Sequence, residues 1–222
     1  MRAFRPEAQT AASASLVVTP SYLSTTQSSP LPVTQLTPSN DNTSIPVWAL
    51  VGDSVKAVAA TAALQLSGKP ARAFVFNLTP LAIDKAQAHP AGFVDSLKRD
   101  LDKVMNRAGL ALPYWFCIDI TKEGRLHVHG AFAGNLEQHP TIRDAMKAAW
   151  GPGEPKQLWF SVGPCDDGWA TYSVRNHRKV EKLIGRPDDR KVRTLTINQP
   201  LRRDAEWTYG EIRRIMKRAP SN

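Results

Sequence analysis

The sequence predicts an α+β fold, a ferredoxin-like βαββαβ core extended to a five-stranded, mainly antiparallel sheet with flanking helices. Short β-branched and aromatic segments alternate with amphipathic segments between residues 72 and 217. The order of the predicted elements is β-α-β-β-α-β-α-β-α, and the first six are those of a split βαβ sandwich. An apolar fraction of 42% in 222 residues is enough for a buried core.

The N-terminal residues differ in composition from the rest. Residues 1–45 are rich in Ser, Thr, Pro and Gln, so we expect a disordered arm that buries too little surface to offset its ordering entropy. Residues 46–66 have a helix-forming composition, with Pro46 early in the first turn. They predict a short helix that packs on the domain or on a partner. After a linker ending at residue 68, residues 69–222 are expected to form the main domain.

The main domain opens with a strand, a helix and a hairpin. Residues 72–78 (RAFVFNL) predict a strand by their β-branched and aromatic content. Residues 89–108 predict an amphipathic helix, because apolar residues recur near helical spacing. Residues 113–121 and 125–133 predict two strands, joined by a turn at residues 122–124 (KEG).

Two helix–strand pairs and a final helix complete the domain. The helix of residues 141–150 is ended by a GPGEP run, and a strand over residues 157–162 follows. A DDG run opens the helix of residues 169–184, and a strand over residues 192–198 comes next. The last, basic helix spans residues 201–217. Its expected apolar side consists of Leu201, Ala205, Ile212 and Ile215.

The net charge of +9 is concentrated near the C-terminus. Residues 1–68 contain three basic and three acidic residues, whereas residues 175–222 contain 14 Lys and Arg against 6 Asp and Glu. A basic face on a compact domain suits contact with a phosphate backbone. For the last helix alone, a solvated charged face is the better explanation.

The chain has two cysteines, Cys117 and Cys165, which form neither a CxxC pair nor a zinc-like cluster. We therefore expect two reduced, buried thiols in a cytoplasmic protein. The N-terminal stretch has no continuous apolar h-region, so no secretory signal is predicted. No run of about 18 apolar residues occurs, so no membrane span is predicted either.

Residues 126–130 (LHVHG) contain the strongest candidate for a functional site. Residues two apart in a strand project from the same face, so His127 and His129 point together while Val128 points into the core. Two adjacent imidazoles suit a divalent metal ion, although a chance pair of surface histidines would give the same pattern.

The turn before these histidines decides whether an acidic residue joins them. A three-residue loop with a left-handed glycine places Asp119 opposite His127, where it can supply an oxygen ligand. A two-residue loop would place Asp119 opposite Val128 and break the site. The first register puts Ile118 and Ile120 on the buried face, and we therefore expect it.

The helix predicted over residues 169–184 carries a candidate nucleophile, Tyr172. Arg175 and Asn176 follow at i+3 and i+4 and so share its side of the helix. A phenol attacks phosphorus when a metal holds the phosphate and a nearby cation favours the phenolate. A tyrosine on a helix is more often a core anchor, but all three requirements of this chemistry occur together here.

Three short motifs, residues 76–80 (FNLTP), 127–129 (HVH) and 172–175 (YSVR), occur in this order. They resemble the strand-ending, HUH metal and Tyr-x-x-Lys motifs of the HUH endonuclease superfamily. The closest type is the single-tyrosine rolling-circle replication initiator (Rep). The resemblance covers about residues 72–200, and its βαββαβ order agrees with the predicted sheet.

The resemblance implies an enzyme that nicks and joins single-stranded or hairpin DNA at a specific sequence. Tyr172 would form a 5′-phosphotyrosine and free a 3′-hydroxyl. The implied cofactor is Mg²⁺ or Mn²⁺, held by His127, His129 and an acidic or amide residue. Asp119 lies where many members carry a glutamate, and Asn176 matches the amide of related single-tyrosine transposases, so both are candidates for the third ligand.

The chain departs from the family pattern at Arg175, which replaces the usual lysine. Because arginine cannot readily shuttle a proton, we expect it to position phosphate or stabilise the phenolate. His177 is a further candidate ligand, although a solvated histidine is favoured. The motif has one tyrosine, which argues against two-tyrosine schemes. The sequence has no GxxxxGK[ST] motif, so we expect no nucleotide cofactor. We therefore expect a separate helicase to unwind the DNA.

Other residues are candidates for DNA contact. Thr79 either touches DNA or simply ends the strand, and Trp115 either stacks on a base or covers the sheet edge. The candidate phosphate contacts are Lys179, Lys191, Arg193, Arg202 and Arg203.

Three functions compete. The first is initiation of rolling-circle replication in a plasmid or phage-like element, and the second is single-tyrosine transposition by the same chemistry. The third is non-catalytic nucleic-acid binding on the same fold. Such binders usually display aromatic residues on the exposed sheet face. Here that face is predicted to carry His127, His129 and Asp119, which favours an enzyme.

Overall fold

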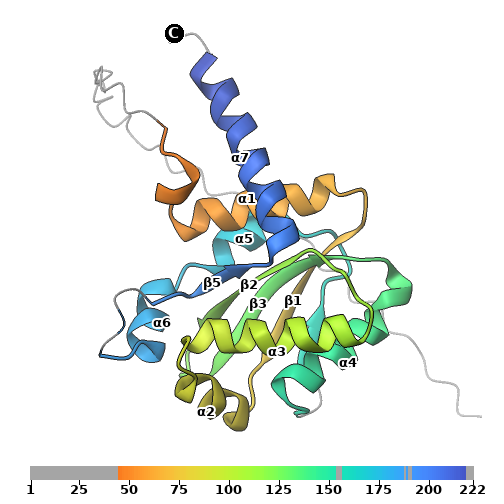
Figure 1. The fold of residues 1–222 in the computed structure, drawn as a ribbon, viewed down its shortest axis with the longest axis vertical. Helices are drawn as coiled ribbons and strands as arrows, with labels where there is room; N and C mark the ends of the chain where they lie inside the picture. Colours follow the sequence, from red (N-terminus) through yellow and green to blue (C-terminus); the bar gives the residue numbers. More distant parts are fainter. Residues whose placement is uncertain (1–44, 154–156, 188, 190–191, 219–222) are drawn as a thin grey trace, which may run out of the picture. The chain divides into compact units, whose positions relative to one another are not determined.

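The computed structural model describes residues 45–153, 157–187, 189 and 192–218. The predicted disordered arm lies outside this range except for residue 45, and so does Lys191. The described residues belong to one compact unit that begins at Thr43. It consists of a β-sheet with helices packed on both faces (Figure 1).

All five strands are antiparallel to their neighbours, in the order β4-β1-β3-β2-β5. Helices follow β1 and β3, as the predicted βαββαβ core requires, and β5 extends the sheet beside β2. The predicted fold class is therefore confirmed. The strands are β1 (Ala71–Asn77), β2 (Tyr114–Ile120), β3 (Leu126–Ala133), β4 (Leu158–Phe160) and β5 (Leu195–Ile197).

The helices match the prediction except at three places. The described helices are α1 (Asp53–Leu66), α2 (Pro80–Ala88), α3 (Phe93–Arg107), α4 (His139–Trp150), α5 (Asp167–Ser173), α6 (His177–Ile184) and α7 (Gln199–Arg218), with 3-10 turns η1 (Trp48–Leu50) and η2 (Leu136–Gln138). Pro46 precedes η1, so it does not belong to the first turn of α1. Helix α2 was not predicted, and the helix predicted over residues 169–184 is two helices.

One face of the sheet packs against α3 and α4 (Figure 1). Large aromatic side chains fill this layer, and Trp150 at the end of α4 contacts Phe74, Phe76 and Phe116. The ring nitrogen of Trp150 donates to the carbonyl oxygen of Leu97 in α3. This layer supports the sheet from below, and the candidate site lies on the opposite face.

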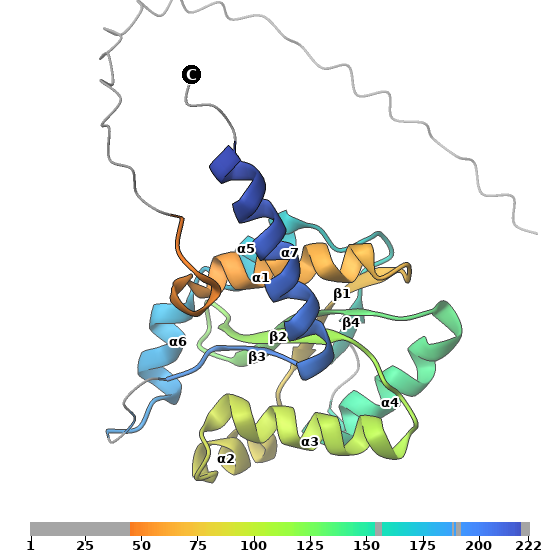
Figure 2. The same ribbon diagram turned by 45° about the horizontal axis from the view of Figure 1, so that its top comes forward.

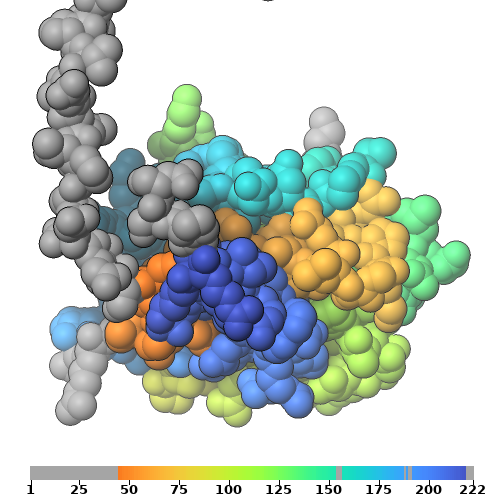
Figure 3. All heavy atoms as spheres, turned by 90° about the horizontal axis from the view of Figure 1, so that it is seen from above, coloured from red at the N-terminus to blue at the C-terminus, as the bar shows by residue number. Residues whose placement is uncertain are grey.

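The opposite face packs against α1, α5 and α7 (Figures 1 and 2). Seen from above, α7 lies against α1 (Figure 3). Helix α1 packs on the sheet through small side chains such as Ala57 and Ala60, which belong to the same buried cluster as Ala73 and Ala131 of the strands. Small residues on both sides let a helix pack closely, and α1 therefore packs on its own domain, one of the two predicted alternatives. The N-terminal helix is part of the same core as the sheet.

Trp115 lies in this second core with no exposed surface, and its ring nitrogen donates to Thr61 of α1 (3.1 Å). Base stacking by Trp115 is therefore wrong, because α1 covers the ring. The apolar side predicted for α7 is buried only in its first half, at Leu201 and Ala205. The C-terminal part of α7 extends past α1 (Figure 2), and Ile212 and Ile215 are exposed.

Candidate metal and tyrosine site

The β2–β3 hairpin has the register predicted from its turn. Gly124 has a φ of +84°, and the amide of Thr121 donates to the carbonyl oxygen of Arg125 (2.9 Å). The loop thus has three residues, and Asp119 pairs with His127. Because strand residues alternate between faces, the carboxylate lies on the same face as both histidines.

Asp119, His127 and His129 form a tight, buried cluster. The two Nε2 atoms of the histidines are 2.8 Å apart. One carboxylate oxygen, Oδ2 of Asp119, lies 3.5 Å from Nδ1 of His129 and 3.7 Å from Nε2 of His127. The exposed fractions of Asp119, His127 and His129 are 0%, 7% and 4%, so a chance pair of surface histidines is excluded.

Two atoms of the cluster that could bind a metal ion make no hydrogen bond to the described residues. Within the described part of the chain, Oδ2 of Asp119 and Nδ1 of His129 are buried without a hydrogen-bond partner. A buried carboxylate is costly unless a positive charge or hydrogen bonds compensate it. Two imidazoles and one carboxylate are a common ligand set for a divalent cation, so the three residues could hold a metal ion.

The protonation state of the histidines suits ligation. Burial, and then the neighbouring His127, lower the pKa of His129 to about 4, against the opposing effect of Asp119. His129 is therefore neutral near pH 7, with a free lone pair. The Nδ1–H of His127 donates to the carbonyl oxygen of Arg125 (3.4 Å), which leaves Nε2 of His127 as the ligand atom.

The carboxylate is oriented from two sides. Its other oxygen, Oδ1 of Asp119, accepts hydrogen bonds from the backbone amide of Ile120 and the side-chain amide of Asn176, both at 2.8 Å. The guanidinium of Arg175 lies 3.8 Å from Oδ2. Asn176 thus contacts the proposed ligand Asp119.

The helical conformation is interrupted between α5 and α6, where one continuous helix was predicted. The ring of His177 bonds to the carbonyl oxygen of Val174 (3.0 Å), and the amide of Arg175 makes a turn bond to Tyr172 (3.3 Å). Ser, Val, Asn and His are weak helix formers, and such local bonds compete with the helical pattern. The break turns Asn176 toward the sheet, and His177 has its own backbone partner rather than full solvation.

Tyr172 lies next to the cluster with 47% of its surface exposed, so it is not a core anchor. Its ring stacks on His129 (5.7 Å between centroids, 19° between planes). The guanidinium carbon of Arg175 lies 3.4 Å from the centroid of the tyrosine ring. Tyr172 and Arg175 thus lie side by side, although a turn rather than the predicted shared helical face brings them together.

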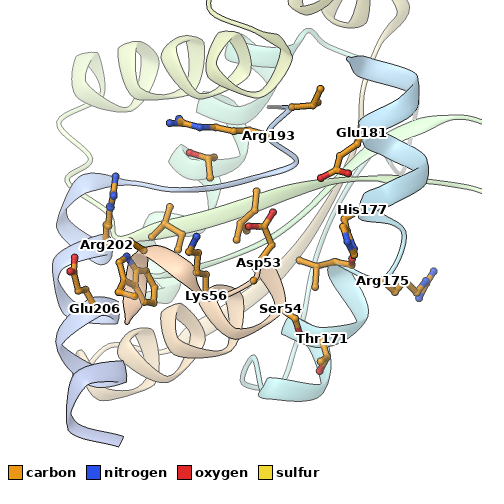
Figure 4. A pocket seen from close by; sticks show the side chains of 18 residues that line it. Asp53, Ser54, Lys56, Thr171, Arg175, His177, Glu181, Arg193, Arg202 and Glu206 are labelled. Carbon is orange, nitrogen blue, oxygen red and sulfur yellow. The ribbon is translucent and has the colours of Figure 1, made fainter. Parts of the chain in front are cut away.

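A groove of about 850 Å³ begins at Arg175 and runs along β5 toward α7. Figure 4 shows Arg175 and His177 at one end, Arg202 at the other, and Lys56 of α1 between them. Three of its acidic residues, Asp53, Glu181 and Glu206, share the walls with the cationic side chains Lys56, Arg175, Arg193 and Arg202. Two of the predicted phosphate contacts, Arg193 and Arg202, line this groove together with Arg175, the neighbour of Tyr172.

The other predicted DNA contacts either lie outside the groove or have other partners. Lys179 is exposed on α6 and Arg203 on α7, outside the groove walls. Arg193 lines the groove and also forms an ion pair with Asp95 (3.2 Å). The hydroxyl of Thr79 accepts from the amide of Ala82 as the cap of α2. It also bonds to the carbonyl oxygen of Trp150, so the structural alternative accounts for its contacts.

Two tryptophans beside the site were not predicted. The ring nitrogen of Trp169 donates to the carbonyl oxygen of Gly130 (3.0 Å), and its ring stacks on Tyr172. Trp159 lies next to Trp169. The position of Trp169 three residues before Tyr172, on one helical side, was an available signal. Trp159 gave none, because its place depends on which strand β4 pairs with.

Comparisons of the chain with protein-family models, curated protein sequences and solved structures gave no match. None of the described helices is long and apolar enough to cross a membrane.

Proposed function

We propose that the protein is a metal-dependent enzyme that nicks and joins single-stranded DNA through Tyr172. The observation that carries the proposal is the stacking of this exposed tyrosine on His129 of the buried three-residue cluster. A candidate nucleophile and a candidate metal centre thus share one opening of the sheet face, as transesterification at phosphorus requires.

The donor set is compatible with Mg²⁺ or Mn²⁺, with His127, His129 and Asp119 as ligands. The carboxylate favours these ions and the imidazoles extend the set toward Mn²⁺. When bound, the ion supplies charge that polarises a phosphate and stabilises negative charge at its oxygens. Asn176 holds the carboxylate through its hydrogen bond, and in this proposal it also lies within reach as a further ligand.

The proposed reaction balances without any co-reactant. Oη of Tyr172 loses its proton and attacks the phosphorus, so that the Oη–P bond forms and the P–O3′ bond breaks. The leaving 3′-oxygen takes up a proton and becomes a 3′-hydroxyl, while the 5′-phosphate stays on the tyrosine. Attack by a 3′-hydroxyl on this phosphotyrosine reverses the step and joins the strand.

Arg175 has two roles in this scheme. Its guanidinium lies against the tyrosine ring and close to Asp119, where a fixed positive charge stabilises the negative charge that develops on the reacting oxygens during the attack. Arg175 lies at the end of the groove with its guanidinium directed away from the other lining side chains (Figure 4), where it can bind a phosphate of a strand that crosses the tyrosine. Arginine stays protonated throughout, so the proton of Tyr172 goes to solvent or to another group.

The biological setting we propose is initiation of rolling-circle replication in a plasmid or phage-like element, with a separate helicase to unwind the duplex. Transposition by the same chemistry is the second candidate. It is favoured by the contact between Asn176 and Asp119, because an amide at this position completes the metal site of the transposases that the motif resembles. Origin hairpins and paired element ends are the substrates that separate the two.

An end-labelling experiment tests the chemistry. A pool of random single-stranded oligonucleotides is incubated with the full chain and Mn²⁺, then resolved on a denaturing protein gel. We expect a 3′-end label to travel with the protein and a 5′-end label to remain on a free fragment. Tyr172→Phe and His129→Ala should abolish the adduct, whereas Tyr22→Phe serves as the control. The opposite label polarity, or an adduct that survives Tyr172→Phe, would contradict the proposal.

A further inference from the structure

The sheet face beside the metal cluster is open on the side of β1 and β4. Trp159 of β4 pairs with Val75 of β1, and Val75 pairs with His129 of β3. These three residues therefore form one row across the strands, on a single face. Trp159 is 49% exposed and Val75 is half-buried, so this part of the row is an apolar surface open to solvent next to the candidate site.

Trp169 links this surface to the nucleophile. Its ring centroid lies 6.3 Å from that of Trp159, 5.9 Å from that of Tyr172 and 5.0 Å from that of His129. The hydrogen bond to Gly130 fixes the ring in place. Trp159, Trp169 and Tyr172 thus form a continuous aromatic strip that ends at the metal cluster.

The aromatic strip and the groove are connected through Arg175. The groove begins at Arg175, whose guanidinium lies on the tyrosine ring. Trp169 also stacks on this ring and leads to Trp159 and the edge of the sheet. A strand crossing the tyrosine would therefore meet the positive charge of Arg175 and the flat rings of Trp169 and Trp159.

We propose that Trp159, Val75 and Trp169 form a subsite on which an unpaired nucleobase of single-stranded DNA stacks beside the reacting phosphate. This inference rests on the proposed function, which places DNA at Tyr172. A base presents its flat π-face to such a surface only when it is not stacked in a duplex. The subsite therefore selects single-stranded over double-stranded DNA, and it does so without reading the base sequence.

A binding measurement with three variants tests the subsite. The parent is the full chain with Tyr172→Phe, which keeps the ring but cannot form an adduct, in the presence of Mn²⁺. The probe is a fluorescein-labelled random single-stranded 20-mer, followed by anisotropy. Trp159→Ala should raise Kd about 5- to 100-fold, since stacking on one aromatic residue is worth roughly 1–3 kcal/mol per base. Trp159→Phe should retain most of the affinity.

Two controls separate stacking from other effects. Trp207→Ala removes another exposed tryptophan, far along the chain on α7, and should leave Kd within about twofold. An abasic oligomer of the same length keeps its phosphates, so Trp159→Ala should barely change its binding. Unchanged 20-mer affinity in Trp159→Ala, or an equal loss for the abasic oligomer, would overturn the subsite.

The adduct assay, run in parallel with Tyr172 intact, keeps the two proposals apart. If an adduct forms and Trp159→Ala changes neither binding nor cleavage, the subsite is refuted and the nicking activity stands. If single-stranded DNA binds in a Trp159-dependent way and no adduct forms, the nicking activity is refuted and base stacking stands.

Discussion

At the scale of single residues, the cluster illustrates how far side-chain alternation carries a prediction. The period of two in a strand places His127 and His129 on one face, and Gly124 in the loop brings Asp119 opposite His127. These are local relations, so the sequence alone predicts them. The burial of the cluster does not follow from local relations, because the helices that cover this face, α1 and α5, come from distant parts of the chain.

The cysteines provide a prediction based on pKa. Burial is the main cause that raises the pKa of Cys165 to about 12, and it also raises that of Cys117. Because the thiolate is the reactive form, we expect both to react with a disulfide reagent about a hundredfold more slowly in the native protein than in denaturant. Rapid native labelling at about pH 8 would contradict this burial.

The raised pKa of Cys165 also predicts how the free energy of unfolding changes with pH. The raised pKa of Cys165 means that the unfolded thiol ionises near its ordinary value of 9.0 while the folded thiol does not. The stabilisation is complete below that pH and is lost as the pH rises toward about 12. Cys165→Ala should therefore flatten the fall in the free energy of unfolding over this range, which denaturant titrations at several pH values would measure.

At the scale of elements, the errors have physical causes. Helix α2 was missed because Thr79-Pro80, a helix-capping pair, also matches the end of a strand. The break after α5 follows from side-chain bonds that compete with the helix. The position of α1 was left open because its small alanine side chains give little amphipathic contrast, although they pack closely on the sheet.

Gly130 provides a test of the packing around the sheet, because it lies in β3, which pairs with both β1 and β2. A Cβ at this position would lie 2.5 Å from the ring of Phe74 and 2.5 Å from the carbonyl oxygen of Trp115. Gly130→Ala should therefore lower the free energy of unfolding by about 2 kcal/mol or more.

The matched control for that change is Gly210→Ala in α7, where nothing lies within 4 Å of the added atom. It should stabilise the protein by about 0.5–1 kcal/mol, because alanine is the better helix former. Chemical denaturation of both variants measures the two effects. Equal effects of the two substitutions would mean that the packing around Gly130 is looser than described.

At the scale of the whole molecule, distant parts of the chain build the candidate site and the groove beside it. The hairpin supplies the metal ligands, α5 supplies Tyr172, the turn after α5 supplies Arg175, and α1, β5 and α7 wall the groove. The sequence indicated the charge near the C-terminus. It did not indicate which cations line the groove, since that depends on how α7 returns across the sheet.

The groove makes a prediction about salt. If it binds the phosphate backbone, Arg202→Gln should lower the slope of log Kd against log salt by about one. The neighbouring Arg203 is exposed outside the groove walls, so Arg203→Gln should change the slope less. Anisotropy titrations over a range of salt concentrations give both slopes, and equal slopes would contradict a directed path for the strand.

The central claim is that Tyr172 becomes covalently attached to DNA, and peptide mapping tests it most directly. The protein is incubated with single-stranded DNA and Mn²⁺, digested with nuclease and trypsin, and analysed by mass spectrometry. The account predicts that the peptide containing Tyr172 gains a 5′-linked nucleotide, and that omission of Mn²⁺ or His129→Ala removes this mass. A nucleotide on another residue, or on Tyr172 in the His129→Ala variant, would contradict it.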